Sequence, residues 1–201
     1  IFRELEEMGA YNINLVTPDH VSDLIAEALA LYRPSVPVVY NSSGYALVSA
    51  LERIDPFIDI YLPDLKFCSP ALSERYTGRK DYFERAGEAV AFMAKKPVSY
   101  DETGKMLSGC IVRHLVLPMC TSDSLKVLDF LKSVLPGGVP LSLMRQYTPM
   151  GEIEGFPELA RPITAREYRR VLEYAEALGF ETIFTQEKES AKKAFIPSWD
   201  F

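Results

Sequence analysis

The sequence predicts an α/β protein in which about six strands alternate with helices and form a parallel sheet. Short apolar runs rich in β-branched and aromatic residues alternate with longer segments whose apolar residues recur every three to four positions. The intervening segments are long enough for crossover connections, which join parallel strands. Polar residues recur where the predicted strands end. We therefore expect a barrel-like (β/α) array with its site at the carboxyl mouth.

The predicted elements follow one another regularly along the chain. A helix lies within residues 1–9 and ends at Gly9. Strands are expected at 11–17, 36–40, 58–66, 111–118, 141–147 and 182–185. Further helices are expected at 18–32, 46–53, 69–76, 81–96, 127–135 and 164–178. Residues 98–108 suit a small hairpin or loop, 150–162 form a connection long enough to be functional, and the tail to Phe201 is expected to pack across the domain.

Local signals support the helices. Thr17 and Pro18 offer an N-cap hydroxyl and a first-turn proline to the second helix. Thr164 and Glu167 have the spacing of a capping box at the start of the last helix. The inner face of the second helix is predicted to hold Val21, Leu24, Ile25, Ala28, Leu29 and Tyr32. The inner stripe of the helix at 81–96 is predicted to hold Ala86, Ala89, Val90, Met93 and Ala94.

The strand at 58–66 organises the candidate site. Its front half is apolar and β-branched, which suits a buried strand, and its back half places Asp64 and Lys66 two residues apart. If the backbone stays extended, these two side chains point the same way. An α/β protein usually keeps its ligand site at such a strand end, although an ordinary salt bridge is an equally open interpretation. Arg113 interrupts the next apolar strand and needs an anionic partner if it is buried.

Composition and charge argue against several classes of protein. The chain has 201 residues, 48% of them hydrophobic and 25% charged, which suits one globular domain. A net charge of -6, with no run of Lys or Arg, argues against a nucleic-acid or anionic-membrane partner. No apolar stretch reaches membrane-spanning length and no signal peptide opens the chain, so a cytoplasmic location is expected.

The cysteines and histidines do not form a recognisable metal motif. Cys68, Cys110 and Cys120 are odd in number and widely spaced, so reduced thiols are expected rather than disulfides. Together with His114 they lack the close cysteine pair of a zinc site. We expect His114, which lies on a predicted strand, and His20, which lies in the first turn of a helix, to be structural.

Several blocks of sequence carry a resemblance to a known family. In order they are NINLVTPDHV, VVYNSSGY, IDIYLPDLKF, IVRHLVLP and SLMRQYTPM. They resemble the radical S-adenosylmethionine (radical SAM) proteins related to pyruvate formate-lyase activating enzyme, most closely their uncharacterised iron-sulfur branch. The resemblance covers nearly the whole chain. It implies a partial (β/α)6 barrel of TIM type and an enzyme that reductively cleaves SAM at a [4Fe-4S] cluster, making a 5'-deoxyadenosyl radical for hydrogen abstraction.

The resemblance also implies which residues bind SAM. The strand end at Thr17 falls where relatives carry a GGEP-type motif that holds the methionyl amino group, and Asn41 opens the DTNG-like turn. Asp64 and Lys66 match the DxK element near the methionyl carboxylate, and Arg113 serves the same region. The last-strand position, where activating enzymes often have a histidine, is occupied by Gln and Tyr. The implied cofactor-site residues are Thr17, Pro18, Asn41, Ser42, Ser43, Asp64, Lys66, Arg113, Gln146 and Tyr147.

The chain departs from the family pattern in two ways. VTP and NSSG replace GGEP and DTNG, which removes two acidic side chains. The cluster-binding CxxxCxxC motif is absent, and the spacing of the cysteines that are present does not reproduce it. In the family this motif lies upstream of the first block, and the chain opens at Ile1 already in a helical pattern. We therefore expect a missing N-terminal portion to carry the cluster ligands, and this chain as written to be unable to assemble the cluster.

Partners and alternative functions follow from the same residues. The resemblance implies a glycyl-radical enzyme or another protein substrate as partner, and an electron donor such as flavodoxin or ferredoxin. One alternative is a non-catalytic ligand-binding barrel. Another is an aldolase-type barrel in which Lys66 forms a Schiff base, although the neighbouring Asp64 argues against it because a carboxylate raises the pKa of an amine.

Overall fold

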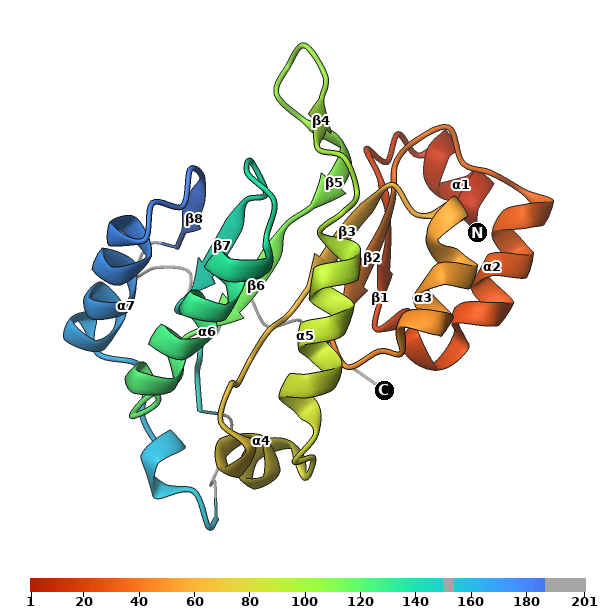
Figure 1. The fold of residues 1–201 in the computed structure, drawn as a ribbon. Helices are drawn as coiled ribbons and strands as arrows, with labels where there is room; N and C mark the ends of the chain where they lie inside the picture. The colour runs from red at the N-terminus through yellow and green to blue at the C-terminus, as the bar shows by residue number, and fades with distance from the viewer. Residues whose placement is uncertain (150–153, 187–201) are drawn as a thin grey trace.

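The computed structural model describes residues 1–149 and 154–186, in which strands alternate with helices (Figure 1). The strands are β1 (Ile13–Val16), β2 (Val38–Ser42), β3 (Ile60–Pro63), β4 (Ser99–Tyr100), β5 (Met106–Cys110), β6 (Val112–Leu115), β7 (Leu141–Met144) and β8 (Ile183–Thr185). The α-helices are α1 (Phe2–Glu7), α2 (Ser22–Leu31), α3 (Val48–Ile54), α4 (Pro70–Thr77), α5 (Tyr82–Met93), α6 (Thr121–Val134) and α7 (Ala165–Ala177). Short 3₁₀ helices are η1 (Pro18–Val21), η2 (Asp55–Phe57) and η3 (Pro157–Leu159). The structure is therefore of the mixed α/β class that the sequence predicts.

The strands form two sheets that meet at a single bridge in the part of the chain that the structure describes. One sheet has the order β1-β2-β3-β5-β4 and the other has the order β6-β7-β8. Neighbouring strands are parallel except for the β4–β5 hairpin, which is antiparallel. Asp64 and Arg113 pair through their backbones and link β3 to β6. Only Ile111 separates β5 from β6, so the chain passes from one sheet to the other in one extended segment.

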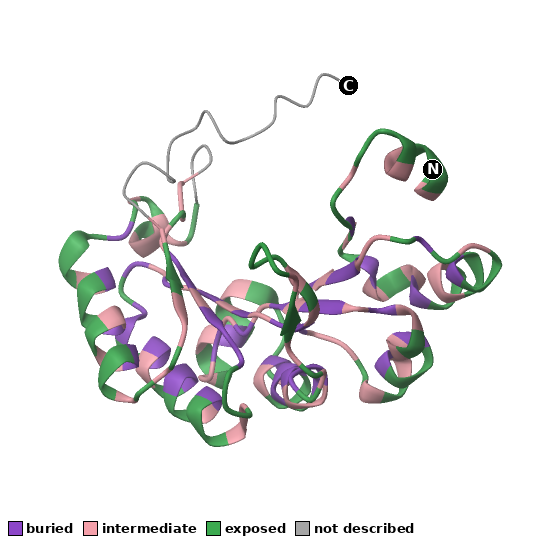
Figure 2. Ribbon diagram, turned by 90° about the horizontal axis from the view of Figure 1, so that it is seen from above, coloured by how far each residue is buried: buried purple, intermediate pink, exposed green. Residues whose placement is uncertain are grey.

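The hydrophobic core lies between the sheets and the larger helices, which cover one face (Figure 2). The predicted α5 stripe is confirmed, because its residues are at most 2% exposed. Tyr40 of β2 and Tyr61 of β3 are paired in register and meet edge to face, with ring centroids 5.8 Å apart. Because side chains alternate along a strand, Asn41, which follows Tyr40, faces the opposite side of the sheet.

Strand ends differ from the prediction at the candidate site. Asn41 and Ser42, predicted as a polar turn, are the last residues of β2, because both pair with β3. β3 ends at Pro63, and Lys66 lies beyond it. The backbone N–H of Lys66 donates to the hydroxyl of Tyr82 rather than to a neighbouring strand. Gln146 and Tyr147 also lie beyond their strand, since β7 ends at Met144.

Two packing predictions are corrected by tertiary structure. The predicted hairpin at 98–108 is present, but β5 also joins the main sheet by pairing with β3, at Ile60 and Gly109. Leu24, predicted to face inward, is 65% exposed. Ala28, also predicted to face inward, is exposed as well, because the face of α2 that packs on the core is formed by Ser22, Ile25, Ala26 and Leu29. The predicted packing of the tail falls on residues 187–201, outside the described residues.

Candidate functional site

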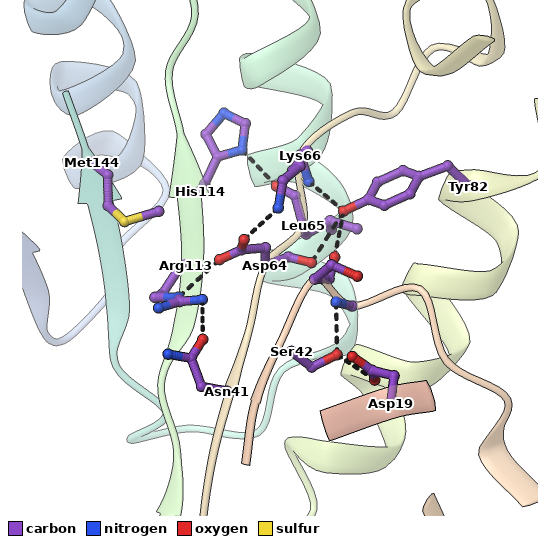
Figure 3. A network of polar contacts seen from close by, with 12 residues as sticks. Asp19, Asn41, Ser42, Asp64, Leu65, Lys66, Tyr82, Arg113, His114 and Met144 are labelled. Carbon is purple, nitrogen blue, oxygen red and sulfur yellow. Dashed lines mark hydrogen bonds and ion pairs between the residues drawn. The ribbon is translucent and has the colours of Figure 1, made fainter. Parts of the chain in front are cut away.

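Side chains from β2, from the segment after β3 and from β6 meet at the junction of the two sheets (Figure 3). Asp64 lies between Lys66 and Arg113 and forms an ion pair with each. Arg113 donates from Nε to Asp64 Oδ1 over 2.8 Å and from Nη2 to Asn41 Oδ1 over 2.6 Å. The shared orientation of Asp64 and Lys66 and the anionic partner of Arg113 thus agree with the sequence. We call Asn41, Asp64, Lys66 and Arg113 the charged cluster.

The charged cluster has the electrostatic character of an anion site. Two cations share one carboxylate, so the formal charge of the three ionised side chains is +1. The side chains of Asp64, Arg113 and Lys66 are 17%, 23% and 32% exposed, so a ligand can reach them from solvent. Lys and Arg side chains carry three and five N–H donors, more than Asp64 and Asn41 use. An incoming carboxylate could therefore be bound without leaving a charge unpaired.

A tyrosine hydroxyl holds the turn that carries Asp64 and Lys66. Lys66 N donates to the hydroxyl oxygen of Tyr82 over 3.0 Å. The same hydroxyl lies 3.0 Å from the Ser43 carbonyl oxygen and 3.2 Å from the Asp64 carbonyl oxygen. Tyr82 was not anticipated from the sequence, where it counts only as an aromatic residue at a helix start.

His114 supports the same turn and is structural, as the sequence predicts. Its ring is 1% exposed, with Nδ1 2.7 Å from the Leu65 carbonyl oxygen and Nε2 2.9 Å from Ser124 Oγ. Because a carbonyl oxygen can only accept, Nδ1 carries the proton and Nε2 accepts from the Ser124 hydroxyl. Burial lowers the pKa of His114, which keeps the ring neutral. Because both ring nitrogens are hydrogen-bonded, neither is free to bind a metal ion.

The next residues of the turn are held by a buried carboxylate. Asp123, near the start of α6, accepts from Cys68 N over 3.0 Å and from Ser69 N over 2.8 Å. Ser69 is also the N-cap of α4, where its hydroxyl accepts from Leu72 N. Side chains of α5, β6 and α6 therefore fix the irregular backbone between β3 and α4.

Ser42 faces away from the charged cluster, toward Asp19. Its hydroxyl donates to Asp19 Oδ1 over 2.8 Å and accepts from Gly44 N over 3.0 Å (Figure 3). The Tyr40 hydroxyl also donates to Asp19 Oδ1, over 3.2 Å. Ser42 is thus committed to shaping the turn after β2. Sequence reasoning missed Asp19, although its position just beyond a predicted strand end was a usable signal.

Thr17, which follows β1, lies beside β2, and its hydroxyl does not cap a helix as predicted. Thr17 has a left-handed backbone (φ 52°, ψ 51°), and its hydroxyl donates to the Val16 carbonyl oxygen over 2.8 Å. Thr17 N donates to the Asn41 carbonyl oxygen over 2.8 Å. The left-handed residue turns the chain directly into η1, whose first residue, Pro18, is buried. The hydroxyl is therefore not aimed at the helix N-terminus.

The hydrogen bonds of Gln146 and Tyr147 are made outside the charged cluster. Gln146 Oε1 accepts from Gln186 Nε2 over 3.0 Å. The Tyr147 hydroxyl donates to the Leu159 carbonyl oxygen over 2.7 Å, at the end of η3. The Gln146 bond therefore ties the end of β7 to the residue after β8, and the Tyr147 bond ties it to the long connection after β7.

That connection is attached to α4 by an ion pair. Arg75 donates from Nε to Glu158 Oε1 over 2.7 Å and from Nη2 to the Gly155 carbonyl oxygen over 2.9 Å. The Tyr76 hydroxyl also donates to Glu158 Oε1, over 2.8 Å. Hydrogen bonding to the Arg75 guanidinium is the main cause that lowers the pKa of Glu158 to about 2. Glu158 is consequently ionised across the ordinary pH range.

The cysteines do not fit an iron-sulfur cluster. In the described ranges, 1–149 and 154–186, no group of three or more His, Cys, Asp or Glu side chains could hold a metal ion. Cys110 is buried in β5, Cys68 follows β3 and Cys120 precedes α6. Burial raises the pKa of all three thiols, whereas cluster ligation requires thiolates. The structure also contains, among the described residues, no helix long and apolar enough to cross a membrane.

Comparison with known proteins identifies the fold. No family model matches the sequence. An uncharacterised protein of Methanocaldococcus jannaschii is 28% identical over 179 residues, which are 86% of this chain and 48% of that protein, so the chain spans about half the length of this relative.

Two solved structures share the fold. A domain of pyruvate-formate lyase-activating enzyme from Bacteroides vulgatus superposes with a TM-score of 0.63 at 9% identity, covering 88% of this chain and 98% of that chain. Streptococcus suis SuiB superposes with a TM-score of 0.59 at 13% identity, covering 99% and 45% of the two chains. These likenesses show the fold.

Proposed function

We propose that the intact protein is a radical SAM enzyme related to pyruvate formate-lyase activating enzyme. In this proposal residues 1–201 form a single SAM-binding domain with the partial (β/α)6 barrel architecture of that family. The charged cluster supports the proposal, because it is a net positive site beside the carboxyl ends of the parallel strands β2 and β3, in a fold shared with an activating-enzyme domain.

The residues of the charged cluster have distinct proposed roles. Lys66 and Arg113 donate hydrogen bonds to the methionyl carboxylate of SAM, because both retain N–H groups beyond those used within the cluster. Asp64 holds the two cations close together, and Asn41 fixes the guanidinium of Arg113. When SAM is cleaved at a reduced cluster, it supplies the 5'-deoxyadenosyl radical for hydrogen abstraction. Thr17, Pro18, Ser42, Ser43, Gln146 and Tyr147 remain predicted neighbours of the cofactor.

In this proposal the [4Fe-4S] cluster and the partner proteins belong to the intact protein. Because the cysteines of this chain do not meet, the ligands of a [4Fe-4S] cluster would come from residues outside it. A glycyl-radical enzyme or another protein is the proposed substrate, and flavodoxin or ferredoxin the proposed electron donor. A cytoplasmic location is part of the same proposal.

The proposal is tested on the full-length protein produced without oxygen. Iron per chain is measured first, followed by the electron paramagnetic resonance spectrum of the reduced form with and without SAM. We expect a four-iron signal that changes when SAM is added. Calorimetric titration should show that SAM binding weakens at least tenfold in Lys66→Ala, which removes a charged donor to SAM, and in Asp64→Ala, which releases the two cations that Asp64 holds together. Asp23→Ala, which removes an exposed ion pair with Arg53, serves as the matched control.

The separation of the cysteines favours a second candidate, a protein that binds its ligand without radical chemistry. SAM binding by a full-length protein that contains no iron would support it. Unchanged affinity in both charged-cluster variants would instead show that the ligand site lies elsewhere. The aldolase-type alternative is not favoured, because the nitrogen of Lys66 is bound to Asp64 in an ion pair rather than free to attack a carbonyl carbon.

A further inference from the structure

The hydroxyl of Tyr82 connects the turns that follow β2 and β3. Tyr82 is the first residue of α5 and is 3% exposed. Its oxygen accepts from Lys66 N, and its proton is directed at the carbonyl oxygens of Ser43 and Asp64 (Figure 3). The hydroxyl is therefore bonded entirely to the backbones of the two turns.

The ring of Tyr82 is held from more than one side. It stacks on Tyr45 with ring centroids 6.2 Å apart and an angle of 10° between the planes. Phe67 packs against it edge to face, with centroids 6.1 Å apart. Burial raises the pKa of Tyr82, so the phenol keeps its proton and remains a donor. These contacts fix where the hydroxyl lies.

The two turns also touch directly, at Gly44. Gly44 has a positive φ of 82°, and a Cβ placed on it would lie 2.1 Å from the Asp64 carbonyl oxygen. The turn after β2 can therefore pack on the backbone of Asp64 only because residue 44 has no side chain. The Tyr82 hydroxyl spans this close contact from Ser43 to Lys66.

We propose that Tyr82 is a positioning residue of the charged cluster. By fixing the backbone of Asp64 and Lys66 against the turn after β2, its hydroxyl sets the direction in which the carboxylate and the ammonium approach Arg113. Asn41 also holds the guanidinium of Arg113, and the backbones of Arg113 and Asp64 are paired, so loss of the Tyr82 hydroxyl would loosen the side-chain ion pairs while the two strands stay together. The inference rests on the proposed function only in taking SAM as the ligand of the charged cluster.

The test compares two tyrosine variants of the full-length protein. Tyr82→Phe keeps the packed ring and removes the hydroxyl. Tyr168→Phe is the matched control, because Tyr168 is 5% exposed and its hydroxyl donates to the Leu143 carbonyl oxygen over 2.8 Å, away from the Asp64 turn. We expect both variants to lose thermal stability, and only Tyr82→Phe to weaken SAM binding, by about fivefold to tenfold.

Two further measurements separate positioning from a general structural effect. In a Lys66→Ala background, Tyr82→Phe should weaken SAM binding less than in the wild type, because one of the two side chains that Tyr82 positions is gone. Without ligand, exchange of the Arg113 Nε proton, followed by nuclear magnetic resonance, should be faster in Tyr82→Phe and unchanged in Tyr168→Phe.

The outcomes distinguish the two proposals. Failure of the wild-type protein to bind SAM would overturn the proposed function. The exchange rate of the Arg113 Nε proton, which is measured without ligand, would then decide whether Tyr82 positions the charged cluster. Unchanged proton exchange in Tyr82→Phe would overturn the positioning role. So would equal loss of SAM affinity in both tyrosine variants, or a full additional loss in the Lys66→Ala background.

Discussion

Arg113 and Asp64 are joined twice, through their side chains and through their backbones. Arg113 Nε donates to Asp64 Oδ1 over 2.8 Å, and the two residues form the backbone bridge between the sheets. Leu65 N strengthens that junction by donating to the Arg113 carbonyl oxygen over 2.9 Å. The ion pair of the candidate site therefore lies at the junction of the fold, and changes there should affect stability as well as binding.

Replacing Asp64 with Asn should destabilise the protein. The change leaves Lys66 and Arg113 facing each other without the anion that separates them. Because the side chains are partly exposed and solvent screens the charges, we expect a loss of about 1–2 kcal/mol in the free energy of unfolding, measured by urea denaturation. Asp23→Asn, in an exposed pair, should cause no measurable loss. Equal effects in the two variants would contradict a special role for the junction.

Replacing Gly44 with Ala should be more costly than replacing Gly78 with Ala. Both glycines have positive φ angles, but an added Cβ at Gly78 meets nothing within 4 Å, whereas at Gly44 it meets the Asp64 carbonyl oxygen. We expect about 1 kcal/mol of destabilisation at Gly78 and roughly 2–4 kcal/mol at Gly44, measured by urea denaturation. Similar losses at the two positions would show that the turn can move away from Asp64.

Stability should fall as the pH drops below 6.5 because of His114. Burial lowers its pKa from 6.5 in the folded state, so the unfolded chain binds more protons just below that pH. The stabilisation is complete above pH 6.5 and is lost toward lower pH, with a slope of at most about 1.4 kcal/mol per pH unit. Urea denaturation between pH 8 and 5 should show this slope in wild type and in His20→Gln, and a shallower one in His114→Gln.

Protonation of Glu158 should release the connection after β7 from α4 only in strong acid. Its pKa of about 2 lies below the ordinary value of 4.5, mainly through Arg75, so its contribution to stability is present above pH 4.5 and is lost as the pH falls toward 2. Carbon-13 titration of the carboxyl group should report the low pKa. In Arg75→Ala the pKa should rise toward 4.5. The same rise in Arg53→Ala would contradict the assignment to Arg75.

Features that depend on neighbouring residues in the sequence were predictable. The capping box of Thr164 and Glu167 is present, because its bonds span only three residues. The pairing of Asp64 with Lys66 was equally accessible, because a single residue separates them in the sequence.

Features set by contacts between distant segments were not predictable. The addition of β5 to the main sheet depends on pairing between residues near 60 and 109. The contribution of Tyr82 to the site depends on where α5 packs, which no periodic pattern specifies. Asn41 and Ser42 were predicted as a turn because their residue types favour turns, and strand pairing overrode that preference.

Consecutive residues of β2 serve opposite faces of the sheet, which constrains how homologous chains can vary in length. Asn41 bonds to Arg113 on one face, and Ser42 bonds to Asp19 on the other. Insertion or deletion of one residue within Val38–Ser42 would exchange the two faces, bringing a core residue into the site and an amide into the core. Evolutionary insertions and deletions should therefore be rare in this strand and should gather in exposed loops such as residues 101–105.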